Sequence, residues 1–341
     1  MNAATPEPAK TNDLVLDVRG LSVVFESIDG RTDAVRDVSF TLPRGRTLAL
    51  VGESGSGKST VGNAILRLIQ HPGRIDAGEV WLRTKPGDDP LDLAALPEDD
   101  DRLFAVRGGQ ISMIFQEPMT ALSPVHTIGN QLREAIALHV TKDRKAGEAL
   151  AVKMMAKVGI PEPRARLKQY PFEFSGGMRQ RVVIAMALVS RPAMVIADEP
   201  TTALDVTVQA QILRLINDLK AELGTSVLFV THDLGVVAQV ADALAVMKQG
   251  RIVERANVRD LFHRPYHPYT RRLLAAVPHA GFEDHGKRLL ETMETPPGMP
   301  AGMGYDQPAD VSNATPTRFR FGDQREVLLW PATAPAAEVA T

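Results

Sequence analysis

The sequence contains no cysteine. Disulfide bonds, thiolate metal sites and cysteine nucleophiles are therefore excluded. An excess of basic side chains is also lacking, because 39 Lys and Arg stand against 41 Asp and Glu, a formal net charge of -2. Nucleic-acid binders normally show a strong basic excess, so we expect no nucleic-acid partner.

Long apolar runs are missing as well. No segment approaches the ~18 apolar residues of a membrane span, and the longest run, residues 182–189, predicts a buried helix. Residues 1–13 are rich in Ala, Pro, Thr and Asn without an apolar core, so we predict a disordered leader and not a signal peptide. These absences favour a cytoplasmic protein, and a hydrophobic fraction of 44% is ordinary for a globular chain with a proper core.

The most informative stretch that is present is residues 52–59, GESGSGKS, which fits the phosphate-loop pattern G-x-x-x-x-G-K-[ST]. An apolar run precedes it and a helical pattern follows, which is the strand–loop–helix context that the motif needs. Glycines let backbone N–H groups turn toward an anion, and the helix N-terminus adds unpaired donors. We therefore predict a nucleotide site. Its loop residues are Gly52, Ser54, Gly55, Gly57, Lys58, Ser59 and Thr60, with Lys58 at the β- and γ-phosphates and Ser59 on Mg²⁺.

Two adjacent carboxylates, Asp198 and Glu199, follow the apolar strand predicted over residues 193–197. In phosphate-loop ATPases a Mg²⁺-ligating carboxylate belongs at such a strand end, which suits Asp198. Glu199 adds a carboxylate suited to orient or deprotonate an attacking water. By itself the pair could equally be a solvated acidic turn before Pro200. Beside a matched phosphate loop, we favour the metal and catalytic roles.

A second helix start, residues 175–177 (the Ser-Gly-Gly segment), offers a hydroxyl and backbone donors. Such a start is a second candidate anion site. Without other motifs, a capped helix with flexible glycines would be the favoured interpretation.

These motifs, in this order and at these separations, resemble the ATP-binding-cassette (ABC) ATPases over about residues 14–261. The resemblance implies that Ser175, Gly176 and Gly177 complete the ATP site of a partner subunit in a head-to-tail dimer. It implies ATP and Mg²⁺ as ligands, and an α/β fold of the phosphate-loop NTPase type. That fold has a RecA-like core, an antiparallel β-subdomain and a helical subdomain.

The same resemblance assigns four further residues. Gln116 matches the glutamine loop, and we expect it to serve Mg²⁺ and catalysis together with Ser59. His232 matches the switch histidine, which contacts the γ-phosphate. Asp205 belongs to the aspartate loop. Phe25 lies where an aromatic residue stacks on adenine, which is the loosest of the matches.

Three segments, residues 115–124, 170–181 and 263–274, look like the oligopeptide/dipeptide importer branch of the family. Membership implies an ATP-hydrolysing subunit that energises import and lies peripherally on the cytoplasmic face of the plasma membrane. Its partners would be a second cassette subunit, two permeases and, indirectly, an external solute-binding protein. Met178, where many cassettes have Gln, favours a distinct paralogue as the second subunit. Branch members often hold an iron–sulfur cluster on C-terminal cysteines, which a chain without cysteine cannot do.

The predicted division is an ABC domain over residues 14–265, with the helical subdomain over about 119–189, and a partly irregular C-terminal extension over 266–341. Within it we expect strands at 14–18, 21–25, 34–42 and 78–82, an exposed acidic loop at 85–101, a hairpin around 249–250 and a short helix at 269–276.

Two other functions remain open at this stage. One is a soluble ABC-type ATPase of translation or DNA repair, and the other is a nucleotide-binding regulator without catalysis. The compact helical block argues against the first, and Glu199 with His232 argues against the second. The sequence does not name the cargo, which in similar systems is a peptide, glutathione, a nickel complex or an oligosaccharide.

Overall fold

The computed structural model describes residues 13–28, 30–202, 204–276, 295–305, 315–321 and 325–331. The predicted leader lies outside the described residues except for Asp13. The C-terminal extension is described in four pieces, of which the first continues directly from the main body. Among the described residues, no helix combines the length and the hydropathy that a bilayer crossing requires.

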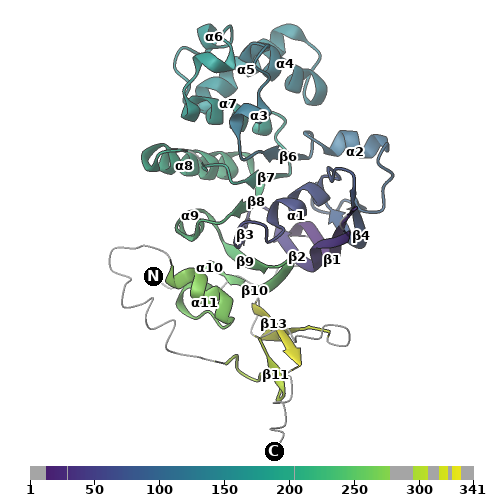
Figure 1. Cartoon of the computed structure of the whole chain (residues 1–341). Coiled ribbons are helices and arrows are strands. Elements are labelled where there is room, and N and C mark those ends of the chain that lie inside the picture. The colour runs from purple at the N-terminus through teal and green to yellow at the C-terminus, as the bar shows by residue number, and fades with distance from the viewer. Residues whose placement is uncertain are drawn as a thin grey trace, which may run out of the picture.

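A mixed sheet runs through the middle of the molecule (Figure 1). Its inner strands β3, β7 and β8 are buried at every residue, as expected for parallel strands covered on both faces. The parallel strands, in spatial order, are β6 (Ile111–Ile114), β7 (Met194–Asp198), β8 (Ser226–Thr231), β3 (Thr47–Val51) and β9 (Ala243–Lys248). β10 (Arg251–Asn257) pairs antiparallel with β9, which confirms the hairpin predicted around residues 249–250.

The second sheet is antiparallel and has the order β2 (Gly30–Pro43), β1 (Leu14–Ser27), β4 (Gly73–Leu82) and β5 (Leu91–Asp92). β1 is one strand where two were predicted. Gly20, at φ 59°, absorbs a shift of register between Val18 and Leu21, so the pairing continues past it. β4 begins five residues before its predicted start, because its exposed first half pairs with β1 without showing an apolar pattern.

The acidic loop predicted for residues 85–101 is only partly a loop. β5 lies within it and pairs with Trp81 and Leu82 of β4. Leu93 and Leu96 are buried in the core beneath the antiparallel sheet. These two leucines anchor an otherwise polar segment to the core. Helix α2 (Asp101–Val106) follows the segment.

Helix α1 (Lys58–Ile65) lies between the two sheets and is held there by its apolar face. Val61, Ala64 and Ile65 are fully buried against residues from β2, β7 and β8. This packing fixes the position of the loop that precedes the helix.

A block of helices is inserted between β6 and β7 and stands at one end of the molecule (Figure 1). Its core joins Leu132 and Ile136 to Met155 and Val182, and continues onto helix α8 (Val206–Leu223). The block consists of α3 (Pro118–Ala121), α4 (Ile128–His139), α5 (Arg144–Lys157), α6 (Pro163–Arg166), the 3₁₀ turn η2 (Pro171–Glu173) and α7 (Gly176–Leu188).

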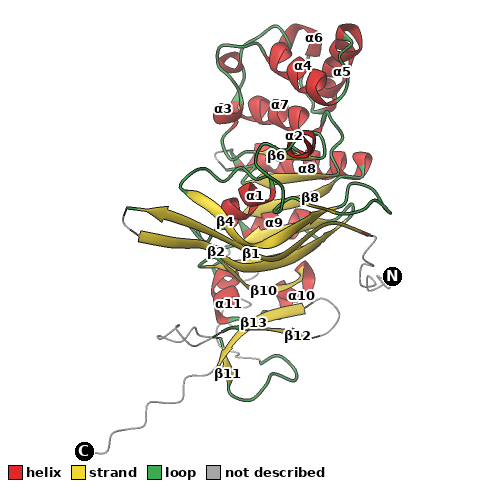
Figure 2. Ribbon diagram, turned by 90° about the vertical axis from the view of Figure 1, so that its right-hand side faces the viewer, coloured by secondary structure: helices red, strands yellow, loops and turns green. Residues whose placement is uncertain are grey.

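The C-terminal elements lie at the opposite end from the helical block (Figures 1 and 2). Helix α11 confirms the short helix predicted at 269–276, one residue earlier. Strand β13 was not predicted and extends the central sheet by pairing with β10. The remaining elements are α9 (Leu234–Val240), α10 (Val258–His263), α11 (Pro268–Ala275), β11 (Met303–Gly304), β12 (Thr317–Phe321) and β13 (Arg325–Pro331).

Candidate nucleotide site

The predicted phosphate loop joins β3 directly to α1. Two of its glycines are required by close backbone approach. A Cβ atom on Gly52 would lie 2.2 Å from the Met247 carbonyl oxygen, and one on Gly57 would lie 2.4 Å from that of Ala34. Gly57, at φ 99°, is the N-cap of α1 and provides no side-chain cap. The first N–H groups of α1 therefore have no side-chain partner from this cap and suit an anion.

Lys58 is buried within the loop, and its Nζ donates to the carbonyl oxygens of Gly52 and Glu53, 2.9 Å from each. Burial lowers the pKa of Lys58, while Glu199 and Asp198 oppose that shift. The ammonium group therefore sits where the loop curves, close to the position that phosphates would take.

Ser59 and Asp198 meet although 139 residues separate them. The Ser59 hydroxyl donates to Asp198 Oδ1 over 3.0 Å. Burial raises the pKa of Asp198, and the bond from Ser59 works against that increase. Both side chains offer hard oxygen atoms, which are the ligands that Mg²⁺ prefers.

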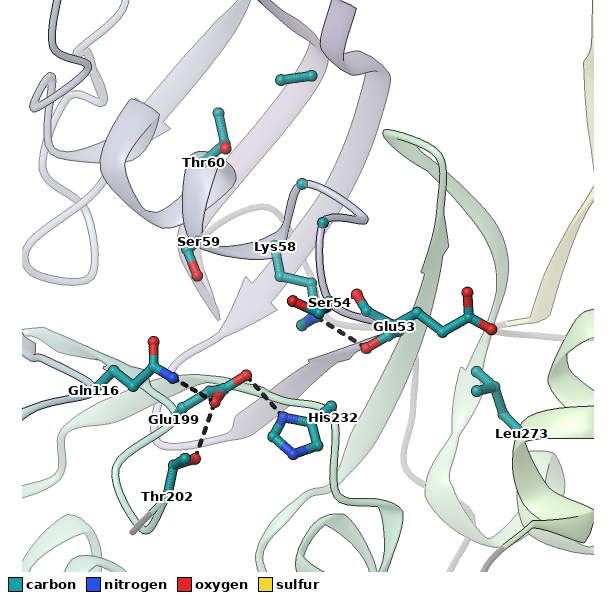
Figure 3. A pocket seen from close by; sticks show the side chains of 14 residues that line it. Glu53, Ser54, Lys58, Ser59, Thr60, Gln116, Glu199, Thr202, His232 and Leu273 are labelled. Atoms are coloured by element: carbon teal, nitrogen blue, oxygen red, sulfur yellow. Dashed lines mark hydrogen bonds and ion pairs between the residues drawn. The ribbon is translucent and has the colours of Figure 1, made fainter.

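Glu199 follows Asp198 and is held by three side chains (Figure 3). Gln116 Nε2 and Thr202 Oγ1 each donate to its Oε2 over 2.9 Å. His232 Nδ1 lies 2.8 Å from its Oε1. Glu199 itself has a positive φ of 45°, which is strained for a non-glycine residue and is often found at functional sites.

With the exception of Asp198, which is not among the lining residues and is bonded to Ser59, these groups surround a cavity of about 650 Å³. Gln116 lies on one side of it and Leu273 on the other, with the phosphate loop between them (Figure 3). The residues that line it are Ala34, Gly52, Glu53, Ser54, Gly55, Gly57, Lys58, Ser59, Thr60, Gln116, Glu199, Thr202, His232 and Leu273. The fold thus brings the phosphate loop together with the predicted catalytic residues.

Phe25 is placed differently from the other predicted ligands. It is not among the residues that line the cavity. Its ring lies against Gly73, where a Cβ atom would come within 2.5 Å of Phe25 Cε1, and it packs on the core with Ile69. Ala34, from the neighbouring strand β2, lines the cavity instead.

The Ser-Gly-Gly segment lies against the start of α8, and neither the segment nor Asp205 is among the residues that line this cavity. Ser175 caps α7, and its Oγ accepts from the Met178 N–H over 3.3 Å. Asp205 caps α8 by accepting from the Val208 N–H over 2.9 Å. Gly177 lies against Val208, where a Cβ atom would come within 2.7 Å of Val208 Cγ1.

Sequence reasoning missed several residues that line the cavity or support it. Thr202 has a weak signal, because it lies three residues after Glu199 and can reach back to it. Glu53 belongs to the phosphate-loop motif but was not singled out. Leu273 gave no signal, because only the fold brings α11 to the cavity.

Comparison with protein families places two regions of the chain. Residues 35–202 match the ABC transporter family. Residues 253–305 match the family described as oligopeptide/dipeptide transporter, C-terminal region.

Curated relatives agree with both matches. A protein named as a peptide import ATP-binding protein of Brucella melitensis biotype 1 is 49% identical over 290 residues, which is 85% of each chain. The glutathione import ATP-binding protein GsiA of Salmonella typhimurium is 52% identical over 268 residues, 78% of this chain and 42% of that protein.

Solved structures give the same fold. The ATP-binding cassette MJ0796, as a dimer in a post-hydrolysis state with ADP and Pi, has a TM-score of 0.62 and 26% identity, over 72% of this chain and 99% of that one. Protein cbiO1 of Clostridium perfringens, part of the ABC transporter complex cbiONQ, has a TM-score of 0.61 and 25% identity, over 74% and 92%. The chain therefore belongs to the ABC transporter ATPases, in the group that carries the oligopeptide/dipeptide transporter C-terminal region.

Proposed function

We propose that this chain is the ATP-hydrolysing subunit that energises the import of peptides, or of related small solutes such as glutathione, through a membrane ABC transporter. The observation that carries the proposal is the held Glu199, placed between Gln116 and His232 beside a matched phosphate loop. The C-terminal region and the import ATP-binding relatives support the direction of transport and the class of solute.

The roles that we propose for the side chains rest on the family resemblance and are supported by where the side chains lie. The loop amides and Lys58 bind the β- and γ-phosphates of ATP, since donors and positive charge gather there. Glu199 orients or deprotonates the attacking water as general base. His232 contacts the γ-phosphate. Its hydrogen bond with Glu199 holds the imidazole beside the proposed general base.

The donor set also fits Mg²⁺. Among the described residues, no group of three or more His, Cys, Asp or Glu forms a metal cluster. Mg²⁺ in phosphate-transfer sites usually takes only one or two carboxylates and otherwise water and phosphate oxygens. Ser59, Asp198 and Gln116 would hold it, and it would supply charge neutralisation at the phosphates.

The Ser-Gly-Gly segment belongs, in this proposal, to the ATP site of a second cassette subunit in a head-to-tail dimer. Ser175, Gly176 and Gly177 do not line the cavity of their own chain, which supports this division of labour. The MJ0796 cassette is dimeric in its structure with ADP and Pi. We propose a distinct paralogue as partner, with Asp205 at the shared face, since the segment lies against Leu204 and Val208 on either side of Asp205 in sequence.

A groove of about 560 Å³ on the helical block is the proposed contact with the membrane permease. It begins a few residues after Gln116 and is lined by the loop after α3 and by one face of α4, including Asn130, Glu134 and Leu138. Leu138 is 71% exposed and adds an apolar side chain to the groove. We propose that a permease helix occupies this groove, so that movement at Gln116 is passed on.

The proposal also includes the location of the protein in the cell and the division of the chain into domains. The protein lies peripherally on the cytoplasmic face of the plasma membrane, and an external solute-binding protein delivers the cargo. Residues 14–265 form the ABC domain, with the helical subdomain over about 119–189, and residues 266–341 form the extension. A soluble ABC-type ATPase of translation or DNA repair receives no support from the relatives.

Reconstitution tests this function. The purified chain, its partner cassette and two permeases in proteoliposomes, with the solute-binding protein added outside, should take up dipeptides or glutathione only when ATP is enclosed on the side of the membrane that carries the cassettes. Glu199→Gln should abolish uptake, and the exposed Lys85→Ala should leave it unchanged. Co-purification with ribosomes or DNA instead of permeases would contradict the proposal.

A further inference from the structure

The phosphate loop is bonded to the C-terminal extension. The hydroxyl of Tyr269, in the first turn of α11, accepts a hydrogen bond from the backbone N–H of Glu53 over 3.1 Å. The two residues are 216 positions apart in the chain. Tyr269 is buried, so its hydroxyl has been brought from water to this loop amide.

The ring of Tyr269 lies under the strand ends that support the loop. It packs in a cluster with Val51, the last residue of β3, and Val246 of the neighbouring strand β9. Lys248 Nζ lies 5.5 Å from the ring centroid, a cation–π contact. Met247 lies between Val246 and Lys248 in sequence. Its carbonyl oxygen is so close to Gly52 that only glycine fits at that position. The tyrosine therefore sits at the base of the phosphate loop.

The start of α11 is also held by hydrogen bonds to β10 and within the turn that precedes the helix. Glu254 of β10 is fully buried and accepts from the N–H groups of Tyr266 and His267 over 2.8 and 3.0 Å. Burial lowers the pKa of His267 to about 3, so its neutral ring keeps a lone pair at Nδ1, which accepts from the Tyr269 N–H over 3.1 Å. Arg325 of β13 lies 3.6 Å from Glu254 and so connects the last strand to this network.

The next turn of α11 reaches the cavity itself. Leu273, four residues after Tyr269, lines the cavity together with Glu53 (Figure 3). The extension therefore meets the nucleotide site at two points, one polar and one apolar.

We propose that the C-terminal extension is a built-in positioning element of the ATP site. Tyr269 is the positioning residue, which holds the Glu53 amide and with it the first turn of the phosphate loop in the form that binds phosphates. The proposal rests on the role of residues 52–59 as the phosphate loop. Because coupling is reciprocal, ATP bound by the loop must also stabilise α11.

Tyr269→Phe tests the hydrogen bond while it keeps the ring in its cluster. A neutral hydrogen bond contributes on the order of 1 kcal/mol, so the dissociation constant for ATP should rise about three- to tenfold. The kcat at saturating ATP should stay within about twofold, because the Glu199 interactions are untouched. Tyr266→Phe is the matched control, since it removes a hydroxyl from the same extension without a contact to the loop, and it should bind ATP like the wild type.

Hydrogen exchange of the full-length protein adds a measurement that a merely structural tyrosine would not affect. Saturating ATP should slow amide exchange in residues 268–275 of the wild type, and should slow it less in Tyr269→Phe. No change of exchange in α11 of the wild type would overturn the proposal without any variant.

Two further outcomes would also overturn the proposal. One is an unchanged ATP affinity in Tyr269→Phe, and the other is an equal loss of affinity in Tyr266→Phe. Lys58→Ala separates this inference from the proposed function. If Lys58→Ala keeps full ATP affinity, the phosphate-loop role fails. If only Tyr269→Phe is without effect, the inference alone fails.

Discussion

Two helices of this chain begin at glycine-led anion motifs, and the fold treats the two beginnings differently. α1 starts at Gly57, which provides no side-chain cap, and its first residues line the chain's own cavity. α7 starts at Ser175, whose hydroxyl caps the helix, and its glycines lie against α8 outside that lining. A chain can thus carry two glycine-containing helix starts of which only one lies at its own cavity, which is what we expect if the other serves the nucleotide of a partner.

The difference has a physical basis in packing. α1 is buried between the two sheets, so its N-terminus is fixed at the edge where the parallel strands end. α7 belongs to the inserted helical block, whose core is shared with α8. In the proposed reaction centre, one half is therefore built around the central sheet, and the other half would be provided by the helical block. The variants below break one half at a time.

Glu199→Gln should have the largest effect, because it removes the proposed general base from the half of the site that is built around the central sheet. We expect kcat for ATP hydrolysis to fall by about 100-fold or more, whereas ATP affinity stays close to that of the wild type. Single-turnover hydrolysis and equilibrium ATP binding measure the two quantities separately. Hydrolysis at the wild-type rate would show that Glu199 is not the base.

Lys58→Ala breaks the same half at the binding step. Loss of a charge-assisted bond to phosphate should weaken ATP binding by about 30-fold. Titration with a fluorescent ATP analogue measures this, and the exposed Lys85→Ala provides the charge-matched control. An unchanged affinity would contradict the phosphate-loop role of residues 52–59.

Ser175→Ala breaks the other half. ATP binding by the isolated chain should be unchanged, while ATPase activity of the assembled dimer should fall by about tenfold. The variant also loses a helix cap, which costs about 1 kcal/mol of stability. Asp143→Ala removes a comparable cap from α5, far from the site, and controls for that cost. Equal losses of activity in both variants would mean that only the cap mattered.

Apart from the loss of hydrolysis expected for a proposed Mg²⁺ ligand, Asp198→Asn should have the smallest effect of these variants, which is on the stability of the nucleotide-free chain. Burial raises the pKa of Asp198 above its ordinary 3.8. The stability contributed by this group is full below 3.8 and is lost as the pH rises through the raised pKa, where a charge becomes buried. The nucleotide-free variant should therefore have a slightly higher Tm than the wild type at pH 8, with the difference shrinking as the pH falls toward 3.8. Thermal unfolding across this pH range measures it, and a lower Tm at pH 8 would contradict the burial argument.

Much of the site could be predicted because its chemistry is local in sequence. The phosphate loop needs glycines, Lys and Ser at fixed spacing, and Asp198 with Glu199 follows an apolar strand, so short patterns were sufficient. The order of those motifs then indicated the family, which the comparisons confirm.

The remainder depends on contacts between distant segments. Tyr269 and Leu273 reach the site only because β10 and Glu254 fix the start of α11. β13 follows a stretch in which periodicity fades, and its buried run, residues 327–330, was overlooked because it is short. The position of Phe25 in the family pattern predicted that its ring stacks on adenine. In the structure the ring packs against Gly73 and Ile69. The adenine contact of Phe25 stays a prediction.

Sedimentation of the Glu199→Gln chain with its partner cassette tests most directly whether the two halves belong to different molecules. With ATP and Mg²⁺ the pair should sediment as a dimer. Ser175→Ala added to the same chain, which alters only the ATP site of the partner, should raise the ATP concentration that the dimer requires. A mixture that stays monomeric with ATP, or a dimer that ignores both ATP and Ser175, would contradict the shared reaction centre.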